Sequence, residues 1–254
     1  YEILSSGILD SSKALDIITV SSQAARAAHM SQADVIKGLA MIMRGFSGDI
    51  KSASEASDLL FAIQKEGQGT YTELIPAVAN LSELTKELGI NQYEMAGAIA
   101  QLSKTSMNTG EALSKYESIL RALVSFGVPI QKAFAQAGYT SAKSAISALG
   151  FANALKLLVD STKDSSKGIE ELFQTAEDFN EGTDESIEKV SDLFTKLGAL
   201  KGVISLSKND FSDLNELIDT MTKSAGRSSE VFEKYQSTLA GKWELIKNKV
   251  SSLT

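Results

Sequence analysis

The amino-acid sequence predicts an all-α protein: a multi-helix array of short amphipathic helical hairpins, oligomeric, with a longer helix at the C-terminus. Three observations predict this class. Two prolines and 18 glycines among 254 residues are too few for an all-β chain, which needs a turn signal about every ten residues. Serine and alanine are the commonest residues while aromatic residues make up only 7%, which is typical of helical chains. Apolar residues recur at intervals of three and four along almost the whole chain, and no alternating strand pattern competes.

Capping residues and glycines divide the first half of the chain into short helices. Ser31 and Asn91 are predicted N-caps because each is followed three positions later by an acidic residue, and Thr109 is predicted to cap a further helix. Pro76 lies near the start of its helix, where a proline does least damage. The predicted apolar stripes, with the glycines that end them, are 35–43, 56–63 before Gly67, 74–88 before Gly89, 99–102, and 113–123 before Gly127.

The second half continues the helical pattern but becomes acidic. Pro129 suits the first turn of a helix, and residues 140–159 predict one or two helices with a break at Gly150. Residues 163–220 contain 14 acidic residues against six lysines. The last helix is predicted over about 229–250. Further stripes are predicted over 169–179, over 187–197 before Gly198, and over 211–221 before Gly226, whereas the apolar run 203–206 fits no single element type.

These elements predict three regions: a helical core region over residues 1–162, an acidic helical region over 163–226 and a C-terminal amphipathic helix over 227–254. Within the first region, residues 31–67 and 91–127 align without a gap at an offset of 60. We interpret this pseudo-repeat as two copies of a unit made of a cap, two helices and a final glycine. A chance alignment of amphipathic helices is the alternative that the sequence leaves open.

Composition excludes several kinds of chemistry. The chain contains no cysteine, which excludes disulfides, thiol nucleophiles and cysteine-based zinc sites, and its one histidine leaves no second imidazole for a zinc site. The formal net charge of −7 lacks the basic footprint of a nucleic-acid-binding protein. No stretch reaches the 18 or so apolar residues that a membrane-spanning helix needs. The chain begins with Tyr1 and has no signal-peptide pattern, so we expect it to be a segment of a longer protein.

None of the candidate sites in the sequence has the pattern that its chemistry requires. His29 lies at the end of a predicted helix, where an imidazole interacts favourably with the helix dipole and needs no catalytic role. Glu66 matches a glycosidase acid only in residue type, since no apolar pocket is predicted near it. Residues 178–184 resemble a calcium loop, but the glycine comes one position early and Lys189 stands where the last glutamate ligand belongs. We therefore predict a non-enzyme with no catalytic, cofactor-binding or metal-binding residue and no cofactor.

The serial order of alanine-rich and glycine-broken segments resembles that of a known protein family. The segments that carry the resemblance are, in order, 24–28, 57–63, 74–78, 88–90, 94–103, 111–113, 120–123, 130–134 and 149–155. Together they are similar to the core region of the tail tape-measure proteins of tailed bacteriophages, also called minor tail proteins. The resemblance covers roughly residues 10–200, and the last fifty residues are similar to the amphipathic stretch that follows this core.

The resemblance implies a structural role, and it carries over no active residue. Such proteins lie inside the tail tube as several parallel copies, and their length sets the length of the tail during assembly in the host cytoplasm. They contact tail-tube and tail-tip proteins, leave the tail before DNA passes, and then contact the host envelope, with no sequence-specific binding of nucleic acid. The resemblance leaves open whether this segment is the ruler, an anchor or an ejected domain.

Two other functions compete with this one. A membrane-active helical protein would use its amphipathic hairpins to insert into or bridge the host envelope, although the acidic central helices are unlike the lysine-rich polar faces of interfacial helices. An enzyme acting on the cell wall would need a catalytic carboxylate, for which Glu66 is the candidate.

Overall fold

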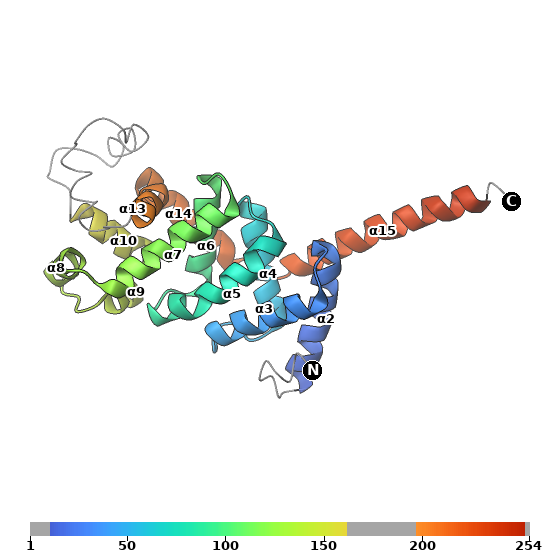
Figure 1. Ribbon diagram of the computed structural model, residues 1–254, viewed down its shortest axis with the longest axis horizontal. Coiled ribbons are helices and arrows are strands. Elements are labelled where there is room, and N and C mark those ends of the chain that lie inside the picture. Colours follow the sequence, from blue (N-terminus) through green and yellow to red (C-terminus); the bar gives the residue numbers. More distant parts are fainter. Residues whose placement is uncertain (1–10, 162–196, 252–254) are drawn as a thin grey trace.

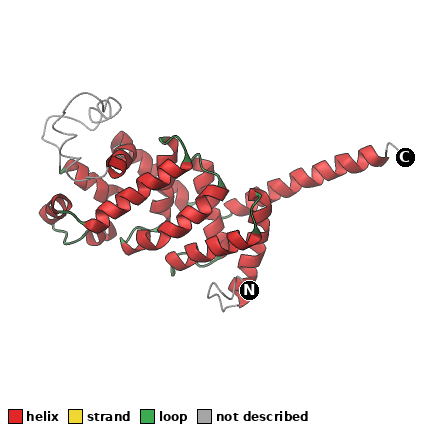
Figure 2. Ribbon diagram, in the orientation of Figure 1, coloured by secondary structure: helices red, strands yellow, loops and turns green. Residues whose placement is uncertain are grey.

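The structure, a computed structural model, describes residues 11–161 and 197–251, and all regular elements within these two ranges are helices (Figure 1 and Figure 2). The all-α prediction is therefore confirmed for this part of the chain. The helices are α2 (Ser11–Ala28), α3 (Gln32–Gly45), α4 (Ala53–Glu66), α5 (Tyr71–Glu87), α6 (Gln92–Lys104), α7 (Thr109–Ser125), α8 (Val128–Gln136), α9 (Ala142–Leu149), α10 (Phe151–Asp160), α13 (Leu197–Leu206), the short 3₁₀ helix η1 (Lys208–Phe211), α14 (Ser212–Thr222) and α15 (Arg227–Ser251). The stripe predicted over 169–179 lies outside the described residues, as does nearly all of the one over 187–197.

Local capping sets most helix ends where the sequence predicts them. The hydroxyl of Ser31 accepts a hydrogen bond from the backbone N–H of the third residue of α3 at 3.1 Å. Asn91 forms a full capping box with Glu94 at the start of α6. Pro129 lies in the first turn of α8, and Gly150, with φ of 82°, separates α9 from α10. These predicted ends are confirmed.

Both ends of α7 differ from the prediction by one residue. Asn108 caps the helix, because its side-chain oxygen accepts from the backbone N–H of the third helical residue at 2.8 Å, whereas Thr109 is the first residue of the helix. At the other end Phe126 takes the left-handed conformation, with φ of 43°, that usually favours glycine. Gly127 consequently precedes α8 instead of ending α7.

A second difference from the prediction concerns α13. Gly198 was expected to end a helix, but it is the second residue of α13, which also contains the run 203–206. The predicted role is wrong because a helical glycine here serves packing: an added Cβ on Gly198 would lie 2.8 Å from the hydroxyl oxygen of Ser118 on α7. The last helix begins at Arg227, close to the predicted start.

The pseudo-repeat aligns with the observed helix boundaries. α3 and α6 begin directly after their caps, Ser31 and Asn91, and α4 ends directly before Gly67 while α7 ends two residues before Gly127. A common origin of the two units stays a prediction, as does the division into three regions. Among the described helices, α13, α14 and α15 all pack against helices of the first predicted region.

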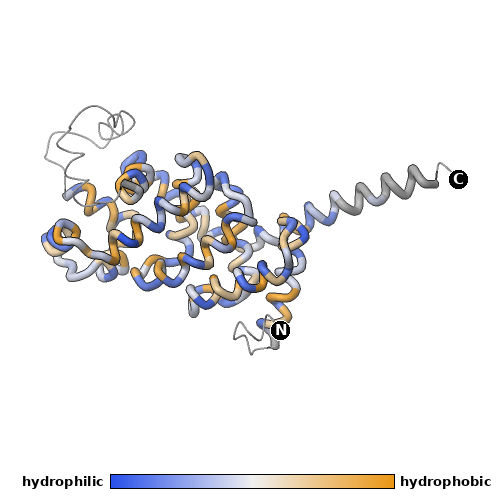
Figure 3. The backbone as a smooth tube through the Cα atoms, viewed as in Figure 1, coloured by the Kyte–Doolittle hydropathy of each residue, from blue (hydrophilic) through white to orange (hydrophobic). Residues whose placement is uncertain are grey.

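α4 and α6 form the centre of the helical body. α4 packs against α2, α3, α5, α6, α14 and α15, and α6 packs against α4, α5, α7, α13 and α14. Every residue of α6 from Glu94 to Ser103 is buried, so its polar side chains depend on partners inside the protein. Apolar residues recur along each helix of the body, consistent with one continuous core (Figure 3).

Glycines allow three helix pairs to approach closely. The pairs are α3 with α5 through Gly38 and Gly45, α6 with α14 through Gly97, and α7 with α13 through Gly198 and Gly202. A Cβ on Gly97 would lie 3.0 Å from the backbone nitrogen of Ile218 and 3.2 Å from its Cα. Because backbone atoms cannot rotate aside as a side chain can, the contact between α6 and α14 depends strictly on this glycine.

Carboxylates on some helices cap the beginnings of other helices. Asp16 of α2 accepts a hydrogen bond from the backbone N–H of Ala53, the first residue of α4, at 2.6 Å. Glu94 uses one oxygen for the backbone N–H of Asn91 and the other for that of Phe151, the first residue of α10, at 2.9 and 2.7 Å. A single buried carboxylate therefore fixes both the start of its own helix and the start of a distant one.

Asp58 of α4 holds the base of α15. This carboxylate is only 6% exposed and accepts hydrogen bonds from the backbone N–H groups of Gly226 and Ser228, at 2.7 Å each, and from the hydroxyl of Ser228. One turn later the ring of Phe232 packs edge-on against Phe61, with 5.6 Å between centroids. Beyond these first turns α15 extends away from the body (Figure 1).

Gly97→Ala should destabilise the body in spite of alanine's higher helix propensity. The new methyl group would press on the backbone of Ile218, and overpacking of this kind costs about 1–3 kcal/mol of unfolding free energy. Gly127→Ala is the matched control, because its Cβ would meet nothing closer than 3.8 Å. Urea unfolding followed by circular dichroism measures both. Equal losses in the two variants would contradict the role given to Gly97.

Burial makes the stability of the body sensitive to alkaline pH. Loss of solvation raises the pKa of the phenols of Tyr71 and Tyr116, so both stay protonated in the folded protein while an unfolded tyrosine ionises near pH 10. The unfolded state then binds fewer protons, and the free energy of unfolding should fall as the pH rises above about 10.

Tyr116→Phe should make this alkaline decline shallower by up to about 1.4 kcal/mol per pH unit, the contribution of one proton. Thr85→Val is the control, since it removes the hydroxyl 3.2 Å from that of Tyr116 but leaves the phenol in place. It should lower stability at neutral pH and keep the steep decline. Urea titrations at several pH values between 8 and 11 make the comparison, and an unchanged slope in Tyr116→Phe would refute it.

Candidate functional site

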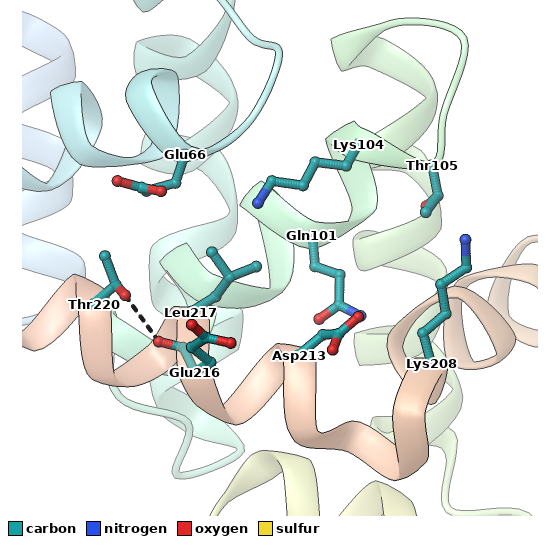
Figure 4. Close-up of a pocket in the computed structure, with 9 residues that line it drawn as sticks. All are labelled: Glu66, Gln101, Lys104, Thr105, Lys208, Asp213, Glu216, Leu217 and Thr220. Atoms are coloured by element: carbon teal, nitrogen blue, oxygen red, sulfur yellow. Dashed lines mark hydrogen bonds between the residues drawn. The ribbon is translucent and has the colours of Figure 1, made fainter.

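A pocket of about 400 Å³ lies where α4 and α6 end beside α14 (Figure 4). We call it the α4–α6–α14 pocket, and it is lined by Glu66, Gln101, Lys104, Thr105, Lys208, Asp213, Glu216, Leu217 and Thr220. α4 contributes its last residue, α6 contributes its last turn and its C-cap, and η1 and α14 form the opposite wall. Segments far apart in the sequence therefore build one cavity.

Gln101 joins the two walls from the buried side of the pocket. It is 3% exposed, and its Nε2 donates hydrogen bonds to the backbone carbonyls of Ser205 and Leu206 at 3.1 and 3.4 Å. These bonds fix which end of the amide is the donor. Its Oε1 is buried and has no hydrogen-bond partner among the described residues. The side chain reaches into the space between α6 and α14 (Figure 4).

Charged side chains surround this amide. The carboxylates belong to Glu66, Asp213 and Glu216, and the ammonium groups to Lys104 and Lys208. Neither lysine forms an ion pair with another residue in the described part of the chain, and in Figure 4 the end of Lys104 points between α4 and α14. The pocket is therefore polar, mixed in charge and richer in carboxylates than in ammonium groups.

An unusual turn places the second wall of the pocket. Asn209, Asp210 and Phe211 all adopt left-handed backbone conformations, with φ of 48°, 55° and 66°. Non-glycine residues in this region are strained and persist only when their surroundings hold them. Phe211 is fully buried, and Asp210 forms an ion pair with Lys156 of α10. Together these contacts hold Lys208 at the rim of the pocket.

The residues weighed from the sequence are scattered through the structure. His29 is exposed directly after α2, with φ of 56°, at the helix end that the sequence indicates. Glu66 is the last residue of α4 and lines the pocket. Residues 178–184 lie outside the described ranges. Within residues 11–161 and 197–251, no three histidine or carboxylate side chains are grouped in a way that could hold a metal ion.

The other pocket residues could not be identified from the sequence. Gln101 lies in an apolar helix where a lone polar residue gives no signal of its own, and Asp213 and Glu216 belong to an amphipathic pattern that predicts solvent-exposed charge. Only the packing of α14 on α6 brings these side chains to Glu66.

A second notable surface lies on α15. Its first turns contact α4 and α2, and the remainder of the helix extends from the body with Trp243 65% exposed (Figure 1). Leu15 and Ile18 on the neighbouring α2 are also exposed. Large apolar side chains on such a projecting element are typical of surfaces that contact another molecule.

No single helix in the described part of the chain combines the length and the apolar composition of a membrane span. α9 and α10 would meet both criteria only if taken together, and they meet at a bend of 117°.

The family of the chain is given by sequence comparison. Comparison with curated proteins and with solved structures yields no significant match. The family model of the phage-related minor tail proteins matches residues 1–174, which is more than half of the sequence and includes every described helix from α2 to α10. The chain therefore belongs to the phage-related minor tail protein family.

Proposed function

We propose that this chain, whose family gives it a structural role in the phage tail and a location in the virion, is a segment of a tail tape-measure protein. In this role several parallel copies occupy the tail tube, set its length during assembly, contact tube and tip proteins, and leave at infection to aid genome delivery. The family match and the serial order of its helices support the proposal. The role is structural, without catalysis.

The observation that carries the proposal is the projecting helix α15. Its 25 residues form a rod of about 38 Å, of which only the base contacts the body. Most of the stability of a helix in a protein comes from the packing of its apolar face, and α15 packs against the body only at its base, so we expect the rest of the helix to pack against a partner. In the sequence, Leu239, Trp243, Ile246 and Val250 follow one another at intervals of four, three and four, the spacing by which parallel helices pack, and Trp243 is 65% exposed. A second copy of the same helix is the partner that fits.

The competing functions have weaker support. For the cell-wall enzyme, Glu66 lies in a polar pocket beside Lys104 and Lys208, not in the apolar pocket that a glycosidase acid needs. The membrane-active alternative would need the apolar residues of α9 and α10 to face lipid, yet Phe151, Leu155 and Leu158 are buried in the body. Neither alternative accounts for a rod anchored at one end by Asp58.

Tail length tests the ruler role directly. Deleting residues 236–249 from the parent gene removes two seven-residue repeats, about 21 Å of helix, and should shorten the tail by about that amount. Inserting a second copy of the same 14 residues is the matched variant and should lengthen the tail equally, because it keeps the spacing. Electron microscopy of many tails measures both. Tails of parental length from both variants would exclude a ruler role for α15.

Self-association through α15 is tested by charge on its exposed face. Trp243→Glu should abolish association of the chain, because packing a carboxylate against a second helix costs more than the contact returns. Thr238→Glu adds the same charge at another exposed position of α15 and should leave association intact. Sedimentation equilibrium over a range of protein concentrations reads the mass of each species. A wild-type chain that stays monomeric throughout would remove this part of the proposal.

A further inference from the structure

Apolar and basic side chains are exposed together where α7 meets α8. Val124 in the last turn of α7 is 49% exposed, and Val128, the first residue of α8, is 60% exposed. Arg121 lies one turn before these valines and Lys132 one turn after them, and both are exposed. We call these four residues the α7–α8 surface. Within the described helices α8 packs mainly against α9 and α10, so its outer face is open to a partner, at the end of the body away from α15 (Figure 1).

The charge of this part of the chain has one sign. Residues 118–159 contain four lysine and arginine side chains and no aspartate or glutamate. Arg121 and Lys156 have carboxylate partners, whereas Lys132 and Lys143 form no ion pair with any described residue. A surface with exposed valines and unpaired lysines favours a partner that is apolar on one side and acidic on the other.

The chain itself contains a segment of that chemistry. Residues 168–188 contain eight acidic residues and no lysine or arginine, and they include the apolar stripe that the sequence predicts over 169–179. These residues lie outside the described ranges. In charge the segment is the opposite of residues 118–159, and its predicted stripe supplies apolar side chains for the exposed valines.

Both ends of this segment are anchored beside the α7–α8 surface. The described chain leaves the body at Ser161, directly after α10, which packs against α8. It resumes at Leu197, the first residue of α13. A Cβ on Gly198 would lie 2.8 Å from the hydroxyl oxygen of Ser118, which is one turn before Arg121 on α7. Because the connection of 35 residues starts and ends here, it gives the segment a high effective concentration at this surface.

We propose that the α7–α8 surface is a docking site for the acidic residues 168–188 of the same chain. The predicted apolar stripe covers Val124 and Val128, and the carboxylates beside it pair with Lys132. Ion pairing at an exposed surface is screened by salt, so the docked state weakens as the ionic strength rises. The contact lies at the other end of the body from α15 and is independent of the tape-measure role proposed above.

Distances between two spin labels test the docking on the whole 254-residue chain. The chain has no cysteine, so Thr140→Cys, in the turn between α8 and α9, and Thr175→Cys, in the segment, define both labelling sites. The labelled chain is diluted into a large excess of unlabelled chain, so that double electron–electron resonance reads distances within one chain. Docking should give one narrow distance distribution, and about 1 M salt should broaden it.

Charge reversal at the surface completes the test. Val128→Glu and Lys132→Glu should each abolish the narrow distribution, because each places a carboxylate against the acidic segment. Leu15→Glu on α2 is the matched control, since this leucine is 66% exposed on a different helix, and it should keep the narrow distribution. A broad distribution in the chain without these three substitutions would overturn the proposal and leave the surface to a second copy or another protein. A narrow distribution that survives both Val128→Glu and Lys132→Glu would overturn it as well.

Discussion

Each helix leaves the first four backbone N–H groups without a partner inside the helix, and a body built from helices of 8 to 18 residues has many such ends. At the surface, residues such as Ser31 cap their own helices. Where an end is buried, a carboxylate from a neighbouring helix takes over: Asp58 caps α15 and Glu94 caps α10. Because these caps come from other helices, the bonds that complete secondary structure also fix the tertiary arrangement. Loss of one such carboxylate would disturb two helices at once.

Close packing supports the same arrangement from the sides of the helices. The caps determine where helices begin, and the glycines on α3, α6 and α13 allow neighbouring helices to approach closely. Inside this frame buried polar side chains pair with one another, as where the hydroxyl of Tyr71 lies 3.3 Å from that of Ser57, although Gln92 and Gln101 each keep one unpaired amide oxygen among the described residues. This tight burial raises the pKa of the phenols of Tyr71 and Tyr116. A closely packed body of this kind is a suitable base for a rigid projecting rod.

The sequence predicts this fold well wherever the determinants are local. Caps followed by acidic residues locate the starts of α3 and α6 to the residue. Errors occur where two adjacent residues compete for one role, as Asn108 and Thr109 do, or where a glycine serves packing instead of termination, as Gly198 does. The pocket could not be predicted, because its residues share no local pattern and meet only through the contact of α14 with α4 and α6. The capping of α15 by Asp58 and of α10 by Glu94 could not be predicted for the same reason.

One element connects the two surfaces that the structure singles out. α14 supplies Asp213, Glu216 and Thr220 to the pocket, and the chain then needs only the short turn after residue 222 to reach Gly226, where Asp58 begins to hold α15. Gly97, one helical turn before Gln101 on α6, packs against the same helix through the backbone of Ile218. A displacement of α14 would therefore change the pocket and the base of the rod together. The rigidity of the contact between α6 and α14 is thus the property on which both the direction of α15 and the shape of the pocket depend.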